Sequence, residues 1–134
     1  MSEIQESYVI DTNILIYYLN QQLPEAVKAQ VDNSILSTCS ISIITRIEVL
    51  GWQGHTKKSL FAARALLTLL EEISLNPTIA DCCIQLRQRY KIKLPDAVIA
   101  ATALVKKQTL MTRNSDDFIN IEGLKLFNPF LPVL

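Results

Sequence analysis

Residues 8–13 read YVIDTN, a short apolar run that ends in three polar residues. This pattern is typical of a buried strand that opens into a loop at its carboxyl end. Further apolar runs, also interpreted as strands, cover residues 35–42, 73–75, 109–112 and 124–127. Segments with helical spacing lie between them. Such an alternation predicts a short parallel sheet with helices on both faces, which is a three-layer α/β/α fold.

The helices are predicted at residues 14–19, 24–32, 43–52, 57–71, 77–90 and 97–105. Pro24, Pro77 and Pro95 each lie at the start of one of them, where a helix tolerates proline best. The last helix is the most apolar and should be buried on most sides. No linker, repeat or low-complexity segment interrupts the pattern, so we expect a single domain over residues 1–134.

The composition limits the classes of protein to which the chain can belong. Of its 134 residues, 49% are apolar, which is enough for the core of one domain. Thirteen Lys and Arg balance thirteen Asp and Glu. This balance argues against a disordered chain and against binding of nucleic acid by bulk positive charge alone. With three glycines, a Gly-rich phosphate-binding loop is nearly excluded.

The cysteines indicate a reducing environment. Cys39, Cys82 and Cys83 are odd in number and two of them are adjacent, which suits neither a disulfide framework nor a zinc site. We expect free thiols. The first residues show no signal peptide, and no run of about 18 apolar residues predicts a membrane span. The expected location is therefore the cytoplasm.

Several acidic residues fall where a parallel sheet binds ligands, at the carboxyl ends of its strands. Asp11 ends the first strand, Glu48 follows the second, and Asp96 begins the most apolar helix. Asp116 and Asp117 follow the strand at residues 109–112. The apolar neighbours of Glu48 and Asp96 predict that both carboxylates are buried, which is costly without a counter-charge.

Carboxylates that converge at one edge of the sheet would also repel one another. The repulsion is about 4 kcal/mol for a pair ~4 Å apart at an effective dielectric constant of ~20. A divalent cation resolves both problems, and Mg²⁺ and Mn²⁺ prefer carboxylate and water oxygens.

Each acid taken alone has a simpler interpretation. Asp11 suits the N-cap of the helix that follows it, and Asp96 suits the first turn of its helix, where the helix dipole favours an acid. Glu48 suits a solvated helix face, and Asp116 and Asp117 suit an ordinary polar loop. The metal hypothesis therefore depends on the convergence of the acids.

The chain resembles the PIN-domain family, and within it the VapC-type toxins of bacterial toxin–antitoxin pairs. Four stretches carry the resemblance, in family order: YVIDTNILIYYL, ISIITRIEVLGW, LPDAVIAATAL and LMTRNSDDF. Together they extend over nearly the whole chain. The pairing of the first stretch with the third is fairly specific, whereas either alone would be weak. The resemblance implies a PIN-like fold.

The resemblance also implies roles for individual residues. Asp11, Glu48 and Asp96 would be acids of a metal site, and Asp117 would be the fourth, with Asp116 as the alternative. Some relatives carry that acid where this chain has Asn114. The residues that would orient carboxylates or water are Thr12, Asn13, Thr112, Asn114 and Asp116.

The implied activity is Mg²⁺-dependent endoribonuclease cleavage, with Mn²⁺ as a plausible substitute, by the toxin of a type II pair. Asp11, Asp96 and Asp117 would hold one or two ions at the scissile phosphate, and Glu48 would complete the site through a bound water. The resemblance further implies an antitoxin partner and a homodimer. The helices at 14–19 and 57–70 suit an antitoxin groove or a dimer face, and core packing explains them equally well.

The charge balance leaves room for a modest path for RNA. If four of the thirteen acids bind metal, nine remain against thirteen Lys and Arg, so the rest of the surface carries about four net positive charges. Arg113, beside the predicted site, and Arg46 are the candidate RNA-binding residues. His55, the single histidine, has no partner in the sequence and is expected at the surface.

Two other functions remain open. A phosphatase or receiver-like domain would use Asp11 as its nucleophile or phosphoacceptor. However, the second Asp of the phosphatase motif is Asn13 here, and the strand at 109–112 ends in Thr-Arg-Asn, without the lysine of that class. The other alternative is a PIN-like module that binds RNA or protein without cutting.

Overall fold

The fold is built on a five-stranded parallel sheet. The computed structural model describes residues 6–131. The strands are β1 (Tyr8–Ile10), β2 (Cys39–Ser42), β3 (Glu71–Ile73), β4 (Thr109–Met111) and β5 (Leu126–Phe127). They are ordered β3-β2-β1-β4-β5, and each neighbouring pair is parallel. The predicted parallel sheet is therefore confirmed.

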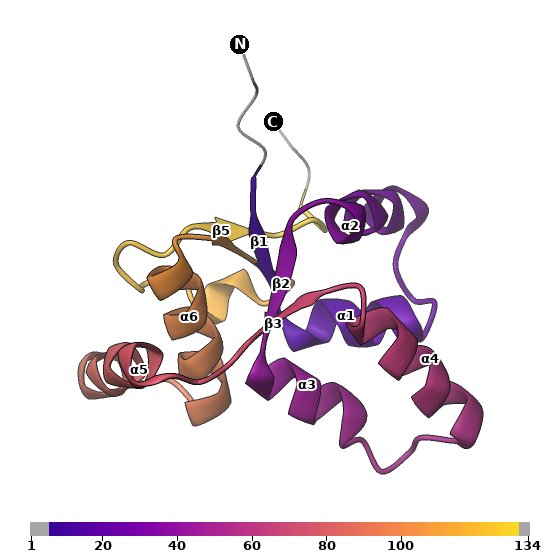
Figure 1. Cartoon of the computed structure of the whole chain (residues 1–134). Coiled ribbons are helices and arrows are strands. Elements are labelled where there is room, and N and C mark those ends of the chain that lie inside the picture. Colours follow the sequence, from indigo (N-terminus) through magenta and orange to yellow (C-terminus); the bar gives the residue numbers. More distant parts are fainter. Residues whose placement is uncertain (1–5, 132–134) are drawn as a thin grey trace.

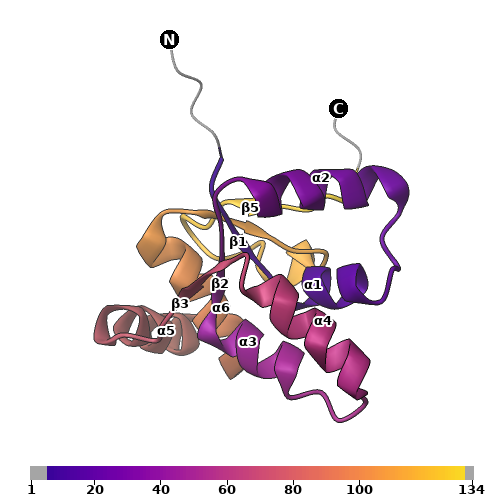
Figure 2. The same ribbon diagram turned by 45° about the vertical axis from the view of Figure 1, so that its right-hand side comes forward.

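Helices cover both faces of this sheet (Figures 1 and 2). They are α1 (Thr12–Leu19), α2 (Glu25–Leu36), α3 (Ile43–Leu50), α4 (Lys57–Leu67), α5 (Pro77–Arg89) and α6 (Leu94–Lys106). Helices α1, α2 and α4 bury their apolar residues with one face of the sheet, and α5 and α6 with the other. Helix α3 follows β2 and contacts both α4 and α6. The predicted three-layer α/β/α fold is confirmed.

Alternation along the central strands divides the core in two. Val9 of β1 and Leu110 of β4 belong to the cluster under α5 and α6, whereas their neighbours Ile10 and Met111 belong to the cluster under α1, α2 and α4. Successive side chains of a strand point to opposite faces, so both faces of these strands must be apolar. This is why the strands read as continuous apolar runs.

Three strand predictions were wrong in their boundaries by two residues or more. The strand predicted at residues 124–127 is β5, which begins at Leu126. The strand predicted at residues 35–42 begins at Cys39, and Ile35 belongs to α2. The reason is that Val27, Val31 and Ile35 follow one another at intervals of four and form the buried ridge of that helix.

The strand predicted at 73–75 lies instead at Glu71–Ile73, because the predicted helix 57–71 ends as α4 at Leu67. β3 is an edge strand, and Glu71 and Glu72 are exposed on it. Charged side chains protect such an edge from pairing with another chain, so its sequence lacks the apolar signal of the inner strands.

The segment after β4 contains a short 3₁₀ helix, η1 (Ser115–Asp117), in place of the predicted polar loop. Phe118, which directly follows η1, is buried in the cluster under α5 and α6. This ring therefore anchors η1, and with it Asp116 and Asp117, to the α6 side of the sheet.

The apolar segment near the carboxyl end packs on α1 as far as it is described. The Phe130 ring lies 6.0 Å from the Tyr17 ring, centroid to centroid, in an edge-on arrangement. Residues 132–134 lie outside the described residues. Among residues 6–131, no helix has both the length and the apolar composition to cross a bilayer.

Candidate active site

The site is centred on Asp11, which stands between the end of β1 and the start of α1. Its backbone N–H donates to the carbonyl of Met111 on β4, at 2.9 Å. Its Oδ1 accepts from the backbone N–H of Thr12 at 2.8 Å, and its Oδ2 accepts from the Thr112 hydroxyl at 2.7 Å. The side chain is 6% exposed. Asp11 is thus both the N-cap of α1 and a buried carboxylate fixed at both oxygens.

Burial raises the pKa of the Asp11 carboxyl to about 6. The hydrogen bonds from Thr112 and Thr12 act in the opposite direction, and the charges of Asp96 and Glu48 raise the pKa further. No cationic side chain of residues 6–131 is among the groups that shift this pKa. A positive charge beside it would favour the carboxylate.

Glu48 is joined to Asp11 through Thr12. The Thr12 hydroxyl donates to Glu48 Oε1 at 2.7 Å and shares a 3.0 Å hydrogen bond with the Thr45 hydroxyl. Of the two interpretations of Glu48, burial is wrong and the solvated helix face is confirmed, because its side chain is exposed. Helix α3 turns Thr45 and Val49 inward and leaves Glu48 on its outer side.

Asp96 lies in the first turn of α6, which begins at Leu94, three residues before the predicted start. It is half-buried, not enclosed as its apolar helix predicted, because the fully buried run of α6 starts at Ala97. Burial raises the pKa of the Asp96 carboxyl, as do the charges of Asp117 and Glu48, whereas Lys93 lowers it. The four acids therefore act on one another's charges: Asp96 and Glu48 raise the pKa of Asp11, and Asp117 and Glu48 raise that of Asp96. Asp116 is not among the charges that shift Asp96.

The other predicted site residues lie around Thr112. The backbone N–H of Asn114 donates to the Thr112 hydroxyl at 3.0 Å, and that of Arg113 donates to Asn13 Oδ1 at 3.5 Å. Asn114 then caps η1. These contacts connect the loop after β4 to the start of α1, across the carboxyl ends of β1 and β4.

The donor set fits a hard divalent cation. All four acids offer carboxylate oxygens, which Mg²⁺ and Mn²⁺ prefer. Within residues 6–131, no three acidic, His or Cys side chains lie close enough to form a ready-made ligand set. Mg²⁺ usually binds through one or two carboxylates, keeps several waters, and shares substrate phosphates. An open cluster of acids suits that mode of binding.

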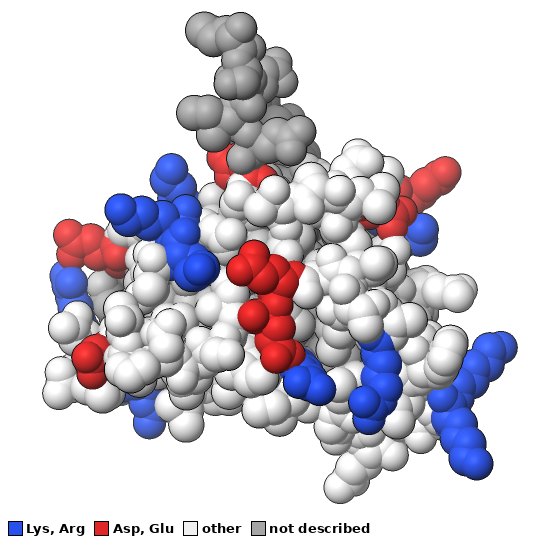
Figure 3. Space-filling view, viewed as in Figure 1, with Lys and Arg blue, Asp and Glu red and all other residues white. Residues whose placement is uncertain are grey.

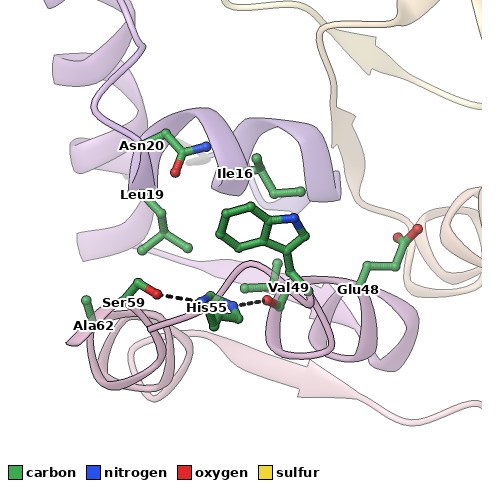
Figure 4. Close-up of a pocket in the computed structure, with 9 residues that line it drawn as sticks. Ile16, Leu19, Asn20, Glu48, Val49, His55, Ser59 and Ala62 are labelled. Atoms are coloured by element: carbon green, nitrogen blue, oxygen red, sulfur yellow. Dashed lines mark hydrogen bonds between the residues drawn. The ribbon is translucent and has the colours of Figure 1, made fainter. Parts of the chain in front are cut away.

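An apolar cavity of about 290 Å³ adjoins Glu48. Figure 4 shows α1 on one side, with Ile16 and Leu19, and α3 and α4 on the other. Trp52, which is 57% exposed, also lines it. Glu48 of the site and the exposed indole of Trp52 therefore line the same cavity.

His55 also lines this cavity, and the expectation that it is an unpartnered surface residue was wrong. Its Nε2 lies 2.7 Å from the Val49 carbonyl, and its Nδ1 lies 2.9 Å from the Ser59 hydroxyl (Figure 4). Because a carbonyl can only accept, Nε2 carries a proton. His55 thus joins the end of α3 to the first turn of α4.

The two candidate RNA-binding arginines have different environments. Arg46 Nε lies 3.5 Å from Glu72 Oε1 on β3, so an acid already partners its charge. Arg113 instead lies against two aromatic rings. Figure 3 shows acidic side chains over the middle of the face along which β3 runs, with Lys and Arg scattered around them. This face presents no continuous basic surface.

Sequence reasoning missed four residues around the site. Thr45 lies one helical turn before Glu48, and Tyr17 lies one turn after Asn13, so helical spacing from a candidate residue could have identified both. No signal in the sequence places His55 against Val49 or Phe130 against Arg113.

A family model described as PIN domain matches residues 8–124. Among solved structures, the chain is similar to a toxin–antitoxin complex from Klebsiella pneumoniae, at 34% identity and a TM-score of 0.77, covering 92% of this chain and 98% of that chain. It is similar to VapBC-1 from nontypeable Haemophilus influenzae at 26% identity and a TM-score of 0.74, covering 91% and 97%. It is also similar to VapBC2 from Rickettsia felis, bound to a promoter DNA fragment, at 25% identity and a TM-score of 0.75, covering 90% and 97%. No curated protein matches the chain.

The raised pKa of Asp11 predicts a pH-dependent effect of Asp11→Asn on the stability of the metal-free protein. A carboxyl with a raised pKa contributes stability that is fully present below about pH 4 and is lost as the pH rises through about 6. Asparagine does not ionise, so Asp11→Asn avoids the cost of burying a charged carboxylate at high pH. We compare the free energy of unfolding of Asp11→Asn with that of the wild type at each pH. This difference should favour the variant by about 2 kcal/mol more near pH 7.5 than near pH 4.5.

Urea unfolding in the presence of a chelator, at both pH values, measures this difference. Asp81→Asn, which removes an exposed acid of α5, is the matched control and should show no such pH dependence. An equal effect of Asp11→Asn at both pH values would contradict the prediction.

Proposed function

The chain belongs to the PIN-domain family, and we propose that it is a Mg²⁺-dependent endoribonuclease, the toxin of a type II toxin–antitoxin pair. The observation that carries the proposal is the buried Asp11 carboxylate. It is fixed by Thr12 and Thr112, and the charges of Asp96 and Glu48 act on it. Similarity to toxin–antitoxin complexes at 25–34% identity over 90–92% of the chain supports the same assignment.

The proposal divides the residues into metal ligands and groups that orient them. Asp11, Asp96 and Asp117 would hold one or two ions, and Mn²⁺ would substitute for Mg²⁺. Such an ion, when bound, supplies an activated water and stabilises charge on the scissile phosphate. Thr112 keeps Asp11 in one orientation, and Thr12 does so for Glu48. Glu48, as an exposed acid, would accept a hydrogen bond from a water at the site.

The residues around Asp11 disfavour the phosphatase or receiver-like alternative. Asn13 stands at the position of that class's second Asp, and its Oδ1 accepts the Arg113 N–H at 3.5 Å. The segment after β4 reads Thr112-Arg113-Asn114, without the lysine that such a site normally uses.

An antitoxin is the protein partner of this proposal. The apolar cavity between α1, α3 and α4 suits an apolar side chain of that partner, and its contact with Glu48 would bring the antitoxin to the edge of the acidic cluster. RNA as the substrate, a homodimer as the assembly, and the cytoplasm as the location belong to the same proposal. The three free cysteines suit a reducing compartment.

Loss of a metal-binding acid is expected to abolish cleavage. Asp11→Asn and Asp96→Asn should each lower kcat/KM for Mg²⁺-dependent cleavage of RNA by about 100-fold or more. Asp117→Asn should also lower it, whereas Asp116→Asn should not, because Asp117 and not Asp116 acts on Asp96. Initial rates on a labelled RNA measure the effect, with Asp81→Asn as the control. Cleavage that persists unchanged in Asp11→Asn would refute the nuclease assignment.

A charge in the cavity is expected to disrupt binding of the antitoxin without loss of cleavage. Ala62 lines the cavity, whereas the preceding residue, Phe61, is 77% exposed and does not line it. Ala62→Arg should weaken binding of the candidate antitoxin at least about tenfold, since a charge would be buried against apolar groups.

Phe61→Arg adds the same charge to the same helix and should leave binding intact. Calorimetric titration with the candidate antitoxin measures both effects, and a cleavage assay checks that both variants are folded. Equal affinities of the two variants would contradict the placement of the antitoxin in this cavity.

A further inference from the structure

Arg113 contacts two aromatic rings that also contact each other. Its guanidinium carbon lies 4.8 Å from the centroid of the Tyr17 ring and 4.6 Å from that of the Phe130 ring, and the two rings pack edge-on against each other. Both distances are typical of cation–π contacts, which arginine makes more often than lysine. The residue directly before it, Thr112, is hydrogen-bonded to Asp11. The cluster of Tyr17, Arg113 and Phe130 therefore lies next to the proposed metal site.

The backbone around Arg113 is fixed from two sides. Asn13 accepts the Arg113 N–H at 3.5 Å, and Tyr17 lies one turn further along the same side of α1. Asn128 donates through Nδ2 to the Arg113 carbonyl at 2.9 Å and accepts the Phe130 N–H through Oδ1, also at 2.9 Å. One asparagine thus positions the arginine and the ring that covers it.

The donors of this guanidinium are not used inside the described part of the chain. Among residues 6–131, the Arg113 side chain makes no hydrogen bond and no salt bridge. By contrast, Arg46 pairs with Glu72, Arg89 pairs with Glu122 at 2.7 Å, and Arg87 donates to a backbone carbonyl at 2.9 Å. A cation–π contact with a ring uses none of the five N–H groups of a guanidinium as a hydrogen-bond donor, so these groups remain available to a ligand.

We propose that the Arg113 guanidinium binds an RNA phosphate next to the scissile bond. This inference rests on the proposed nuclease function. Tyr17 and Phe130 are then positioning residues. A planar, permanently charged fork matches two phosphate oxygens. Because the two rings already restrain the Arg113 side chain, it loses less conformational entropy when it binds a phosphate. The segment at residues 128–130 thereby becomes part of the substrate site.

The charge distribution favours a phosphate over other ligands. The site brings together four acids, and the face over β3 carries more of them (Figure 3), so a polyanionic strand meets repulsion on approach. The exposed guanidinium of Arg113, the residue after Thr112, offsets that repulsion at the point of contact. An acidic side chain of the antitoxin is the competing occupant, and the experiment distinguishes the two.

Steady-state cleavage of an RNA oligonucleotide tests the proposal. Arg113→Gln should raise KM about tenfold and leave kcat within about twofold, because the lost contact serves binding of the substrate. Phe130→Leu should raise KM less, and Phe130→Tyr, which keeps the ring, should restore it. Arg64→Gln, which removes an exposed arginine of α4, is the control and should change neither constant.

Binding of the same oligonucleotide in an Asp96→Asn background is measured separately across a range of salt concentrations. Loss of one phosphate contact should reduce the slope of log affinity against log salt by about one in Arg113→Gln. This measurement does not require cleavage. If the wild type does not cut RNA, the proposed function fails while the comparison of slopes still decides the role of Arg113.

Three results would overturn the proposal. The first is an unchanged KM and an unchanged slope in Arg113→Gln. The second is a fall in kcat without a change in KM, which would place Arg113 in the chemical step. The third is weaker binding of the candidate antitoxin with undiminished binding of RNA, which would make Arg113 a contact for the antitoxin.

Discussion

The burial of one carboxylate, that of Asp11, is the constraint on which the site depends. Asp11 directly follows β1, the central strand of the sheet. Its backbone N–H donates to the Met111 carbonyl of β4, which fixes its backbone between the two core clusters. The charge has no cation among the described residues and is held by one N–H and one hydroxyl. A divalent cation is the partner that best fits this charge and the acids around it.

Two threonines extend this constraint to the rest of the site. Thr12 joins Asp11 to Glu48, and Thr112 joins Asp11 to the backbone of Asn114. Helix α1 then presents different residues on two sides. Ile16 follows Thr12 by one turn and lines the apolar cavity, whereas Tyr17 follows Asn13 by one turn and contacts Arg113. One short helix thus separates the proposed antitoxin cavity from the proposed phosphate site.

The sequence predicts the strands and helices that are encoded by the spacing of apolar residues within one segment. It predicts contacts between distant segments less well. Apolar residues on both faces of β1 and β4 identify a buried parallel sheet, and the PIN-like motifs fall at the ends of its strands. For Glu48, the sequence left both a buried and a solvated position open, because apolar neighbours in sequence do not show which side of α3 faces outward. The contacts of His55 and of Arg113 join elements far apart in the chain, and no local pattern encodes them.

The central claim is that Asp11 and Asp96 share a divalent cation. A crystal structure of the protein soaked with Mn²⁺, with anomalous diffraction to locate the ion, tests it most directly. We expect a peak with carboxylate oxygens of both residues about 2.1–2.2 Å from it. A peak at neither residue, or separate peaks that each bind one of them, would contradict the account.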